Sequence, residues 1–272
     1  MKKKLSLIIM FALFTAVLAA GCAKKEDKVF RVGMEAAYAP FNWTQVDDSN
    51  GAVPIQGTKE FAGGYDVEIA KKIGEKLGKK VVVVKTQWKG LQPAVQSGKI
   101  DAIIAGMSPT PDRRKSIDFS DIYYTSNLVM VVQKGGAYEK ATSIQDFKGA
   151  KITAQLGTFH YTVIDQINGV DKKTAVEDFT AMRVALEAGK IDGYVSEYPE
   201  GVSASAANQK LTMVQFADGQ GFKTSPDDTA IAVGLKKNSK LTATINEVLS
   251  GISEKERKEI MDAAIQHQPS NQ

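Results

Sequence analysis

The segment Gly-Lys-Ile-Asp occurs twice in the chain, 91 residues apart, at 98–101 and 189–192. Each copy follows a run of small and apolar residues and leads into another apolar run, 102–104 in the first copy and 193–195 in the second. This pattern predicts a helix end, a glycine cap, a tight turn and a short buried strand. Two similar α/β lobes of about 100 residues explain the repeat better than one large barrel.

Strands and helices alternate before the first copy. Residues 29–34 alternate like a strand, and Asp66 is expected to cap a helix that Gly78 ends. The β-branched run 81–84 is typical of a strand buried on both faces. This order predicts a parallel sheet with right-handed crossovers.

The second half repeats this order. Residues 151–155 predict a strand and 159–167 a helix, followed by the second copy of the repeat. Strands at 128–132 and 229–235 flank the second lobe, which indicates that the chain crosses between the lobes twice. We expect the helical segment 241–266 to pack on the first lobe.

The first 22 residues have the pattern of a secretory signal peptide. Three lysines at 2–4 precede an apolar run at 5–18, and small residues at 19–21 precede Cys22. The apolar run is shorter than the roughly 20 residues that span a bilayer, and polar residues follow it. We therefore expect an exported protein.

Cys22 is the only cysteine, which excludes an internal disulfide framework and a cysteine-rich zinc site. Its setting resembles a bacterial lipobox, although Ala19 stands where leucine is usual and Leu18 lies one residue earlier. We expect residues 1–22 to be a lipoprotein signal peptide, Cys22 to carry a membrane anchor, and 23–27 to form a tether. The alternative is ordinary cleavage nearby, with Cys22 incidental.

The charge balance excludes further classes of function. Lysine and arginine total 35 against 31 acidic residues, a formal charge of +4; without the three lysines at 2–4 the totals are 32 and 31, or +1. A near-neutral body does not favour nucleic-acid binding. Because His160 and His267 are the only histidines, we expect no histidine metal cluster, and we predict no metal and no cofactor.

Parallel sheets place ligands at the carboxyl ends of their strands, so the residues that follow strands are the first candidates. Glu35 and Tyr38 follow the first strand, where a ring packs on an apolar or guanidinium group and a carboxylate accepts from a cation. The alternative is a core tyrosine beside a surface acid. Tyr65 is a candidate for a second wall of the ligand pocket, and Trp88 belongs either to a wall of this pocket or to the core.

Arg113 follows the strand of the first repeat. Thr110 and Pro111 suit the N-cap and first position of a short helix, which places Arg113 in its first turn. Its planar fork matches a carboxylate, although an Asp-Arg-Arg-Lys run alone is more typical of a solvated face. The preceding loop adds three candidates: Gly106, Met107 and Ser108.

The second lobe supplies the opposite wall. Thr158 opens a helix whose free N–H groups suit a carboxylate, and His160 in the same turn is a weaker candidate because such histidines are usually structural. Glu197 follows the strand of the second repeat, where its carboxylate accepts from an ammonium group. An arginine and a glutamate on facing walls describe a receptor for a zwitterion.

With these motifs, residues 28–265 resemble the extracytoplasmic substrate-binding proteins of polar amino acid ABC transporters, the family of the glutamine and the lysine/arginine/ornithine/histidine binding proteins. The motifs that carry the resemblance are Tyr38-Ala39-Pro40-Phe41, Gly64-Tyr65-Asp66-Val67-Glu68, Gly-Lys-Ile-Asp leading to Gly106-Met107-Ser108-Pro109-Thr110, Arg113, and Ile117-Asp118-Phe119-Ser120 with Tyr123-Tyr124.

The resemblance implies an α/β, two-lobed, type II periplasmic-binding-protein fold, a Venus flytrap with two crossover hinge strands. Lobe 1 is then expected at 28–124 and 230–272, and lobe 2 at 125–229, with hinges near 123–128 and 224–230. The loop from 46 to 61 is expected at the rim of the cleft.

By position, the resemblance implies that Arg113 clamps the α-carboxylate of the ligand, with help from Ser108, the Gly106 backbone and Thr158. Glu197 matches a position, usually aspartate, that holds the α-amino group.

The remaining positions concern the ligand's side chain. Tyr38 and Tyr65 match its walls, and Glu35 matches an acid, commonly aspartate, that meets polar or cationic heads. His160 matches a glutamine of some basic-amino-acid binders.

The implied function is to bind a free L-amino acid and deliver it to an ABC permease, as a monomer anchored on the outer face of the bacterial membrane. Arginine, lysine or histidine is favoured, with glutamine or another polar amino acid as the alternative. A cyclohexadienyl dehydratase-like enzyme would need a general acid, and an ion-paired Glu197 is a poor one. A ligand-sensing receptor domain is the other alternative.

Overall fold

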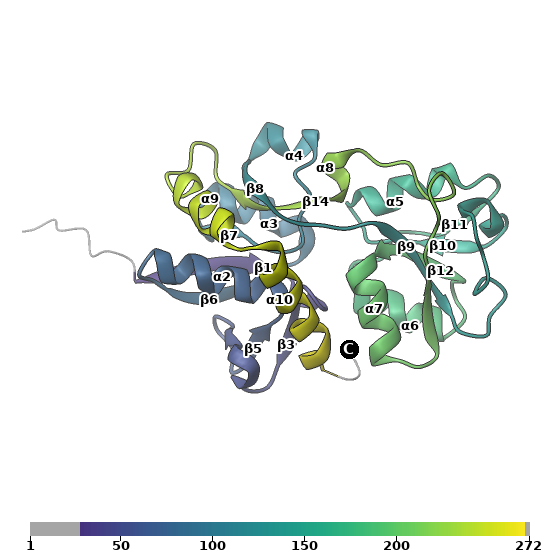
Figure 1. Cartoon of the computed structure of the whole chain (residues 1–272), viewed down its shortest axis with the longest axis horizontal. Helices are drawn as coiled ribbons and strands as arrows, with labels where there is room; N and C mark the ends of the chain where they lie inside the picture. Colours follow the sequence, from purple (N-terminus) through teal and green to yellow (C-terminus); the bar gives the residue numbers. More distant parts are fainter. Residues whose placement is uncertain (1–27, 270–272) are drawn as a thin grey trace, which may run out of the picture.

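A computed structural model describes residues 28–269 of the chain. The expected signal peptide, Cys22 and the tether at 23–27 lie outside these residues. Two lobes, each built on a five-stranded sheet, lie side by side and are joined by crossing strands (Figure 1). Within 28–269, no helix has both the length and the apolar character needed to cross a membrane.

Lobe 1 is built on a sheet of order β6-β1-β7-β14-β8, in which β1 is parallel to both neighbours and β14 is antiparallel to both of its own. The strands are β1 (Val29–Met34), β6 (Lys80–Lys85), β7 (Ala102–Ile103), β8 (Asp118–Thr125) and β14 (Ala230–Leu235). The helices are α2 (Tyr65–Lys76), α3 (Trp88–Ser97), α4 (Pro111–Ser116), α9 (Thr242–Gly251) and α10 (Glu254–His267).

Lobe 2 is built on a sheet of order β11-β10-β12-β9-β13, with β10 parallel to β11 and β12. The strands are β9 (Leu128–Gln133), β10 (Lys151–Thr153), β11 (Asp171–Lys172), β12 (Gly193–Glu197) and β13 (Leu211–Val214). The helices are α5 (Phe159–Val163), α6 (Phe179–Glu187) and α7 (Tyr198–Ala207), with 3₁₀ turns η2 (Ile144–Phe147) and η3 (Ile164–Gln166). The short helix α8 (Pro226–Thr229) lies on the return to lobe 1 and contacts β14.

A small antiparallel sheet of order β2-β3-β5-β4 extends lobe 1. Its strands are β2 (Ala37–Tyr38), β3 (Asn42–Gln45), β4 (Val53–Pro54) and β5 (Phe61–Gly63), with the 3₁₀ turn η1 (Ser49–Gly51) between β3 and β4. The loop from 46 to 61 lies here. Its Ile55 pairs with Val83 of the edge strand β6, and none of its residues lines the cavity described below.

The repeated Gly-Lys-Ile-Asp segment makes the same contacts in both lobes. In lobe 1 the Asp101 carboxylate accepts from the Arg31 N–H at 2.8 Å, and in lobe 2 the Asp192 carboxylate accepts from the Lys151 N–H at 2.8 Å. The preceding isoleucines are buried in both copies. Each aspartate thus joins the turn to the start of the neighbouring strand, as expected for two lobes of one design.

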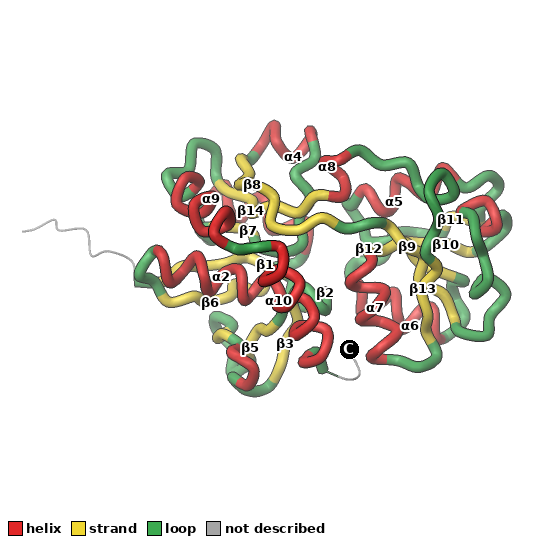
Figure 2. Tube along the Cα trace, viewed as in Figure 1, coloured by secondary structure: helices red, strands yellow, loops and turns green. Residues whose placement is uncertain are grey.

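The two strand crossings between the lobes lie together (Figure 2). β8 continues into β9, and the chain returns through α8 to β14; the Ser126 N–H donates to the Thr229 carbonyl at 3.0 Å. The predicted double crossing is therefore confirmed. In addition, α10 of lobe 1 packs against α7 of lobe 2, where the Gln268 amide donates to the Ser203 carbonyl at 3.3 Å and its oxygen accepts from the Ser203 hydroxyl.

The prediction that Asp66 caps helix α2 is wrong. α2 begins at Tyr65 with Gly64 as its N-cap, at φ 120°, and a Cβ on Gly64 would lie 2.4 Å from the Phe41 carbonyl oxygen. The Asp66 carboxylate instead accepts from Asn42 at 2.8 Å and from the Tyr123 hydroxyl at 2.7 Å. A close backbone approach that only glycine tolerates thus sets the start of this helix.

Candidate functional site

A small cavity lies between the lobes, at the carboxyl ends of β1, β7 and β10. Its residual volume is about 10 Å³, so the two walls are in direct contact. Lobe 1 lines it with Tyr38, Trp88, Gly106, Ser108 and Arg113, and lobe 2 with Gln155, Thr158, Phe159, His160 and Phe179.

Arg113 is a buried cation that forms no direct ion pair among the residues described by the structure, although the charge of Asp228 acts on it. The predicted Thr110 N-cap and Pro111 start of α4 are confirmed and place Arg113 in the first turn, 8% exposed. Its guanidinium donates to the carbonyls of Ser108 at 2.9 Å and Gly157 at 3.3 Å, and no ion pair joins it to a carboxylate within residues 28–269. Burial lowers its pKa to about 10 against the opposing charge of Asp228, and the guanidinium is charged at neutral pH.

His160 lines the opposite wall, and Glu197 lies behind it, in contact with His160 and Tyr38. Glu197 ends β12, is 1% exposed, and accepts from the Tyr38 hydroxyl at 3.1 Å. Its other oxygen lies 3.5 Å from His160 Nε2 without a hydrogen bond, and both His160 ring nitrogens are buried without a hydrogen-bond partner among residues 28–269. Buried polar atoms are nearly always paired, so this cluster is suited to a polar ligand.

Glu35 and Gln155 meet across the cleft. The Gln155 amide, which is buried, donates to both Glu35 oxygens at 3.0 and 2.9 Å and to the Glu177 carbonyl at 3.1 Å. Burial raises the pKa of Glu35 to about 7, the Gln155 hydrogen bond opposes this rise, and the charges of Asp178 and Glu177 add to it.

Aromatic rings form the side walls. The Tyr38 ring lies stacked 4.3 Å from Phe179 across the cleft and 5.0 Å from Phe41. Trp88, left open as wall or core, lines the cavity: its ring lies 4.9 Å from the Arg113 guanidinium carbon and its indole N–H donates to the Gly157 carbonyl at 3.2 Å.

The loop residues Gly106, Ser108 and Thr158 lie where the sequence predicted them. Gly106 has φ +61°, and a Cβ there would lie 2.7 Å from the Tyr38 ring, so glycine is required. The Ser108 hydroxyl donates to the Asp228 carbonyl at 2.8 Å, and the Thr158 hydroxyl to the Gln155 carbonyl at 2.7 Å.

Four predicted site residues do not line the cavity themselves. Glu35 and Glu197 lie directly behind it and are hydrogen-bonded to the lining residues Gln155 and Tyr38. The other two are Tyr65 and Met107. Tyr65 is fully buried in lobe 1, and its hydroxyl donates to the Tyr123 carbonyl at 3.1 Å. Met107 is 1% exposed, and its carbonyl accepts from the Ala232 N–H at 3.0 Å. Both belong to the packing of lobe 1, and Trp88 takes the wall position that was expected of Tyr65.

Sequence reasoning missed the lobe 2 residues Gln155, Phe159 and Phe179. Gln155 is the last residue of the predicted strand 151–155, and parallel sheets bind ligands at the carboxyl ends of their strands, so this rule could have identified it. Phe159 and Phe179 each begin a helix, and no sequence signal separated them from core residues.

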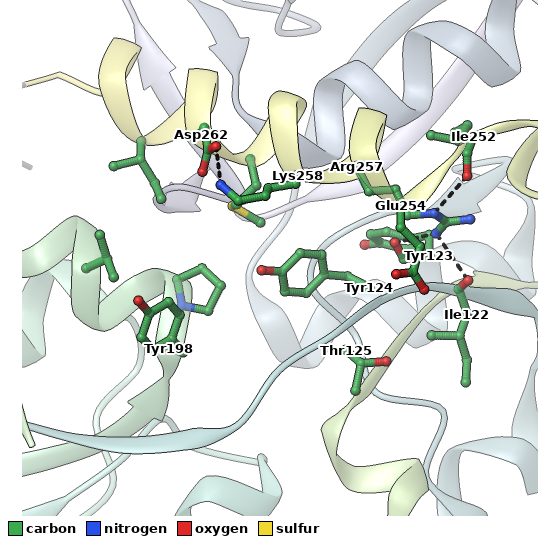
Figure 3. Close-up of a pocket in the computed structure, with 14 residues that line it drawn as sticks. Ile122, Tyr123, Tyr124, Thr125, Tyr198, Ile252, Glu254, Arg257, Lys258 and Asp262 are labelled. Carbon is green, nitrogen blue, oxygen red and sulfur yellow. Dashed lines mark hydrogen bonds and ion pairs between the residues drawn. The ribbon is translucent and has the colours of Figure 1, made fainter. Parts of the chain in front are cut away.

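A wider groove of about 780 Å³ lies between α7, α10 and the crossing strand β8 (Figure 3). The Arg257 guanidinium there donates to backbone carbonyls, including Ile122 at 3.3 Å and Ile252 at 3.1 Å, and Lys258 pairs with Asp262 at 2.5 Å. Within residues 28–269, no buried side-chain atom that lacks a partner belongs to a residue lining this groove. The small cavity lined by Arg113 and His160 is therefore the better candidate for a ligand site.

Residues 30–267 match the model of the bacterial extracellular solute-binding proteins, family 3. The chain belongs to this family. It is 32% identical to the arginine-binding extracellular protein ArtP of Bacillus subtilis over 162 residues, 58% of this chain and 57% of that protein. It is also 32% identical to the L-arginine-binding protein of Pseudomonas aeruginosa over 149 residues, 55% and 51% of the two. The chain spans about half the length of the curated relatives it matches.

Solved structures match over more of the chain. An amino acid ABC transporter substrate-binding protein from Streptococcus pneumoniae, bound to L-arginine, is similar with a TM-score of 0.77 and 27% identity, over 88% of this chain and 94% of that one. An ancestral arginine-binding protein bound to glutamine is similar with a TM-score of 0.70 and 30% identity, over 87% and 97%. The two-lobed periplasmic-binding-protein fold is thereby confirmed.

Proposed function

We propose that this protein is the receptor of an amino acid ABC importer and binds a free L-amino acid, preferentially arginine, between its lobes. Two groups on facing sides of the cavity carry the proposal. The buried Arg113 guanidinium on lobe 1 bonds only to carbonyls and forms no ion pair within residues 28–269. The Glu197–His160 cluster on lobe 2 has polar atoms without a hydrogen-bond partner among the same residues. A zwitterion supplies both missing partners at once.

The ligand's α-carboxylate lies on the fork of Arg113, with the Ser108 and Thr158 hydroxyls beside it, and the α-ammonium group lies on Glu197. Its side chain runs between Tyr38 and Trp88 toward Glu35. Because these groups come from both lobes, a ligand that contacts both favours closure by its difference in affinity between the closed and open states.

Glu35 favours a cationic head. A half-buried carboxylate gains more from a guanidinium than from an amide, because charge-assisted hydrogen bonds are about twice as strong as neutral ones. The arginine complexes among the structural relatives support this choice, and the glutamine complex makes glutamine the second candidate.

The test is a thermal-shift screen of the twenty amino acids on protein unfolded and refolded to remove co-purified ligand. We expect arginine to raise the melting temperature most, since a ligand at 100 times its Kd adds about 2.7 kcal/mol to stability. A screen in which no amino acid shifts the melting temperature would contradict the proposal.

We expect arginine binding to weaken about tenfold between pH 8 and pH 6. The pKa of Glu35 is about 7, so the carboxyl is ionised above this pH and neutral below it, and a cationic ligand loses its partner as the pH falls. Calorimetric titration at both pH values measures this. Glu35→Gln should bind arginine weakly at both; an unchanged pH dependence in that variant would assign the titration to another group.

The same proposal covers catalysis, anchoring and transport. We infer a monomeric binding protein that catalyses no reaction, and loss of water and carbon dioxide from a supplied cyclohexadienol acid would contradict this. A lipid on Cys22 would hold the protein on the extracytoplasmic face of the cell membrane, and mass spectrometry of the mature N-terminus tests this.

If the partner is a permease, deletion of the gene should abolish arginine uptake. Normal uptake in the deletion strain would favour a sensor.

A further inference from the structure

We propose that Gln155 is a built-in competitor of the ligand, whose amide takes the place on Glu35 that the ligand's side-chain head takes in the complex. This inference rests on the proposed function, because it assumes that the ligand reaches Glu35. It predicts that Gln155 weakens binding, although it lies in the site.

The contact joins the lobes directly. Glu35 follows β1 of lobe 1, and Gln155 follows β10 of lobe 2, so their hydrogen bonds exist only when the lobes are closed. The single amide nitrogen bridges both carboxylate oxygens, and the Trp88 backbone N–H also donates to this carboxylate, so the Gln155 amide occupies the side of Glu35 that faces lobe 2. The third bond, from the same nitrogen to the Glu177 carbonyl, fixes the amide in this direction.

This closed arrangement leaves no room for an amino acid. The residual cavity of about 10 Å³ is smaller than an amino acid, and the Tyr38–Phe179 stack and the Arg113–Gly157 bond close it from the other sides. The ligand must therefore enter after the walls separate, and a ligand that reaches Glu35 must replace the Gln155 amide there.

With competition of this kind, the apparent affinity equals the intrinsic affinity multiplied by the fraction of protein molecules that are open and able to bind the ligand. Every ligand must open the same ligand-free closed arrangement before it binds. Weakening that arrangement therefore raises the affinity of all ligands that reach Glu35 by the same factor. A residue that recognises the side-chain head in the complex would instead change the ratio between two ligands. This difference separates a competitor from a specificity contact.

The experiment uses Gln155→Leu, which keeps the volume but removes the donor, with the exposed Gln215→Leu as the matched control. Calorimetry with arginine and glutamine measures affinity, and small-angle X-ray scattering without added amino acid measures lobe separation. We expect about fivefold tighter binding of both ligands, an unchanged ratio between them, and a larger radius of gyration. Gln215→Leu should match the parent protein.

Weaker binding of both ligands would overturn the inference, because Gln155 would then orient Glu35 in the complex. A change in only one ligand would overturn it in favour of a specificity contact. If neither protein bound any amino acid, the proposed function would fail, while an unchanged radius of gyration would by itself refute the Glu35–Gln155 closure contact. A thermal melt of each variant confirms that it is folded.

Discussion

Arg113→Ala should abolish detectable binding of every amino acid, arginine and glutamine alike. The guanidinium is the buried partner of the α-carboxylate, which all amino acids share, and truncating one member of a buried charge pair costs roughly 2–5 kcal/mol, or 30-fold and more in Kd. Calorimetric titration of both ligands measures the loss.

Arg114→Ala is the matched control, since Arg114 lies next in the same helix but is exposed, and it removes the same charge. Arg113→Lys separates charge from shape: a lysine keeps the charge but not the fork, so we expect it to recover only part of the affinity. Normal binding by Arg113→Ala would show that the carboxylate lies elsewhere.

Glu197→Gln should produce the second largest loss, again roughly 2–5 kcal/mol. The change keeps the size of the side chain and its ability to accept from Tyr38, but it removes the negative charge that faces the α-ammonium group. Because the ammonium group is common to all amino acids, arginine and glutamine should weaken in parallel, as measured by the same titrations.

Tyr38→Phe serves as the control for Glu197→Gln. It removes the hydrogen bond to Glu197 and leaves the charge, so a loss of only about 0.5–1.5 kcal/mol is expected. If Glu197→Gln bound no worse than Tyr38→Phe, the ammonium group would have to lie on a different acceptor.

Much of the fold could be predicted because its signals are local. The strand at 29–34 is observed with the predicted bounds, and the Thr110 cap and the glycine at 98 that ends α3 follow from backbone geometry at single residues. The tail at 241–266 was predicted as one helical segment, but it is two helices separated at Ile252 and Ser253, which the apolar pattern alone did not reveal.

The site could be predicted only in part. Arg113 follows a strand and Glu197 is the last residue of one, so the strand-end rule locates both within their lobes. Tyr65 has the same local setting as a wall residue, yet tertiary packing against Phe41 and Tyr124 places it in the core. The pairing of Glu35 with Gln155 depends on how the lobes are rotated, which local sequence patterns do not encode.

The contact of Gln268 with Ser203 affects how the protein should be handled in the laboratory. The described residues end at 269, next to this contact between the lobes, whereas they begin at the outer end of lobe 1 (Figure 1). A purification tag fused at the C-terminus would sit beside a link between the two lobes and would disturb measurements of their motion. A tag placed ahead of residue 28 leaves that link untouched, and it is the better choice for every titration described above.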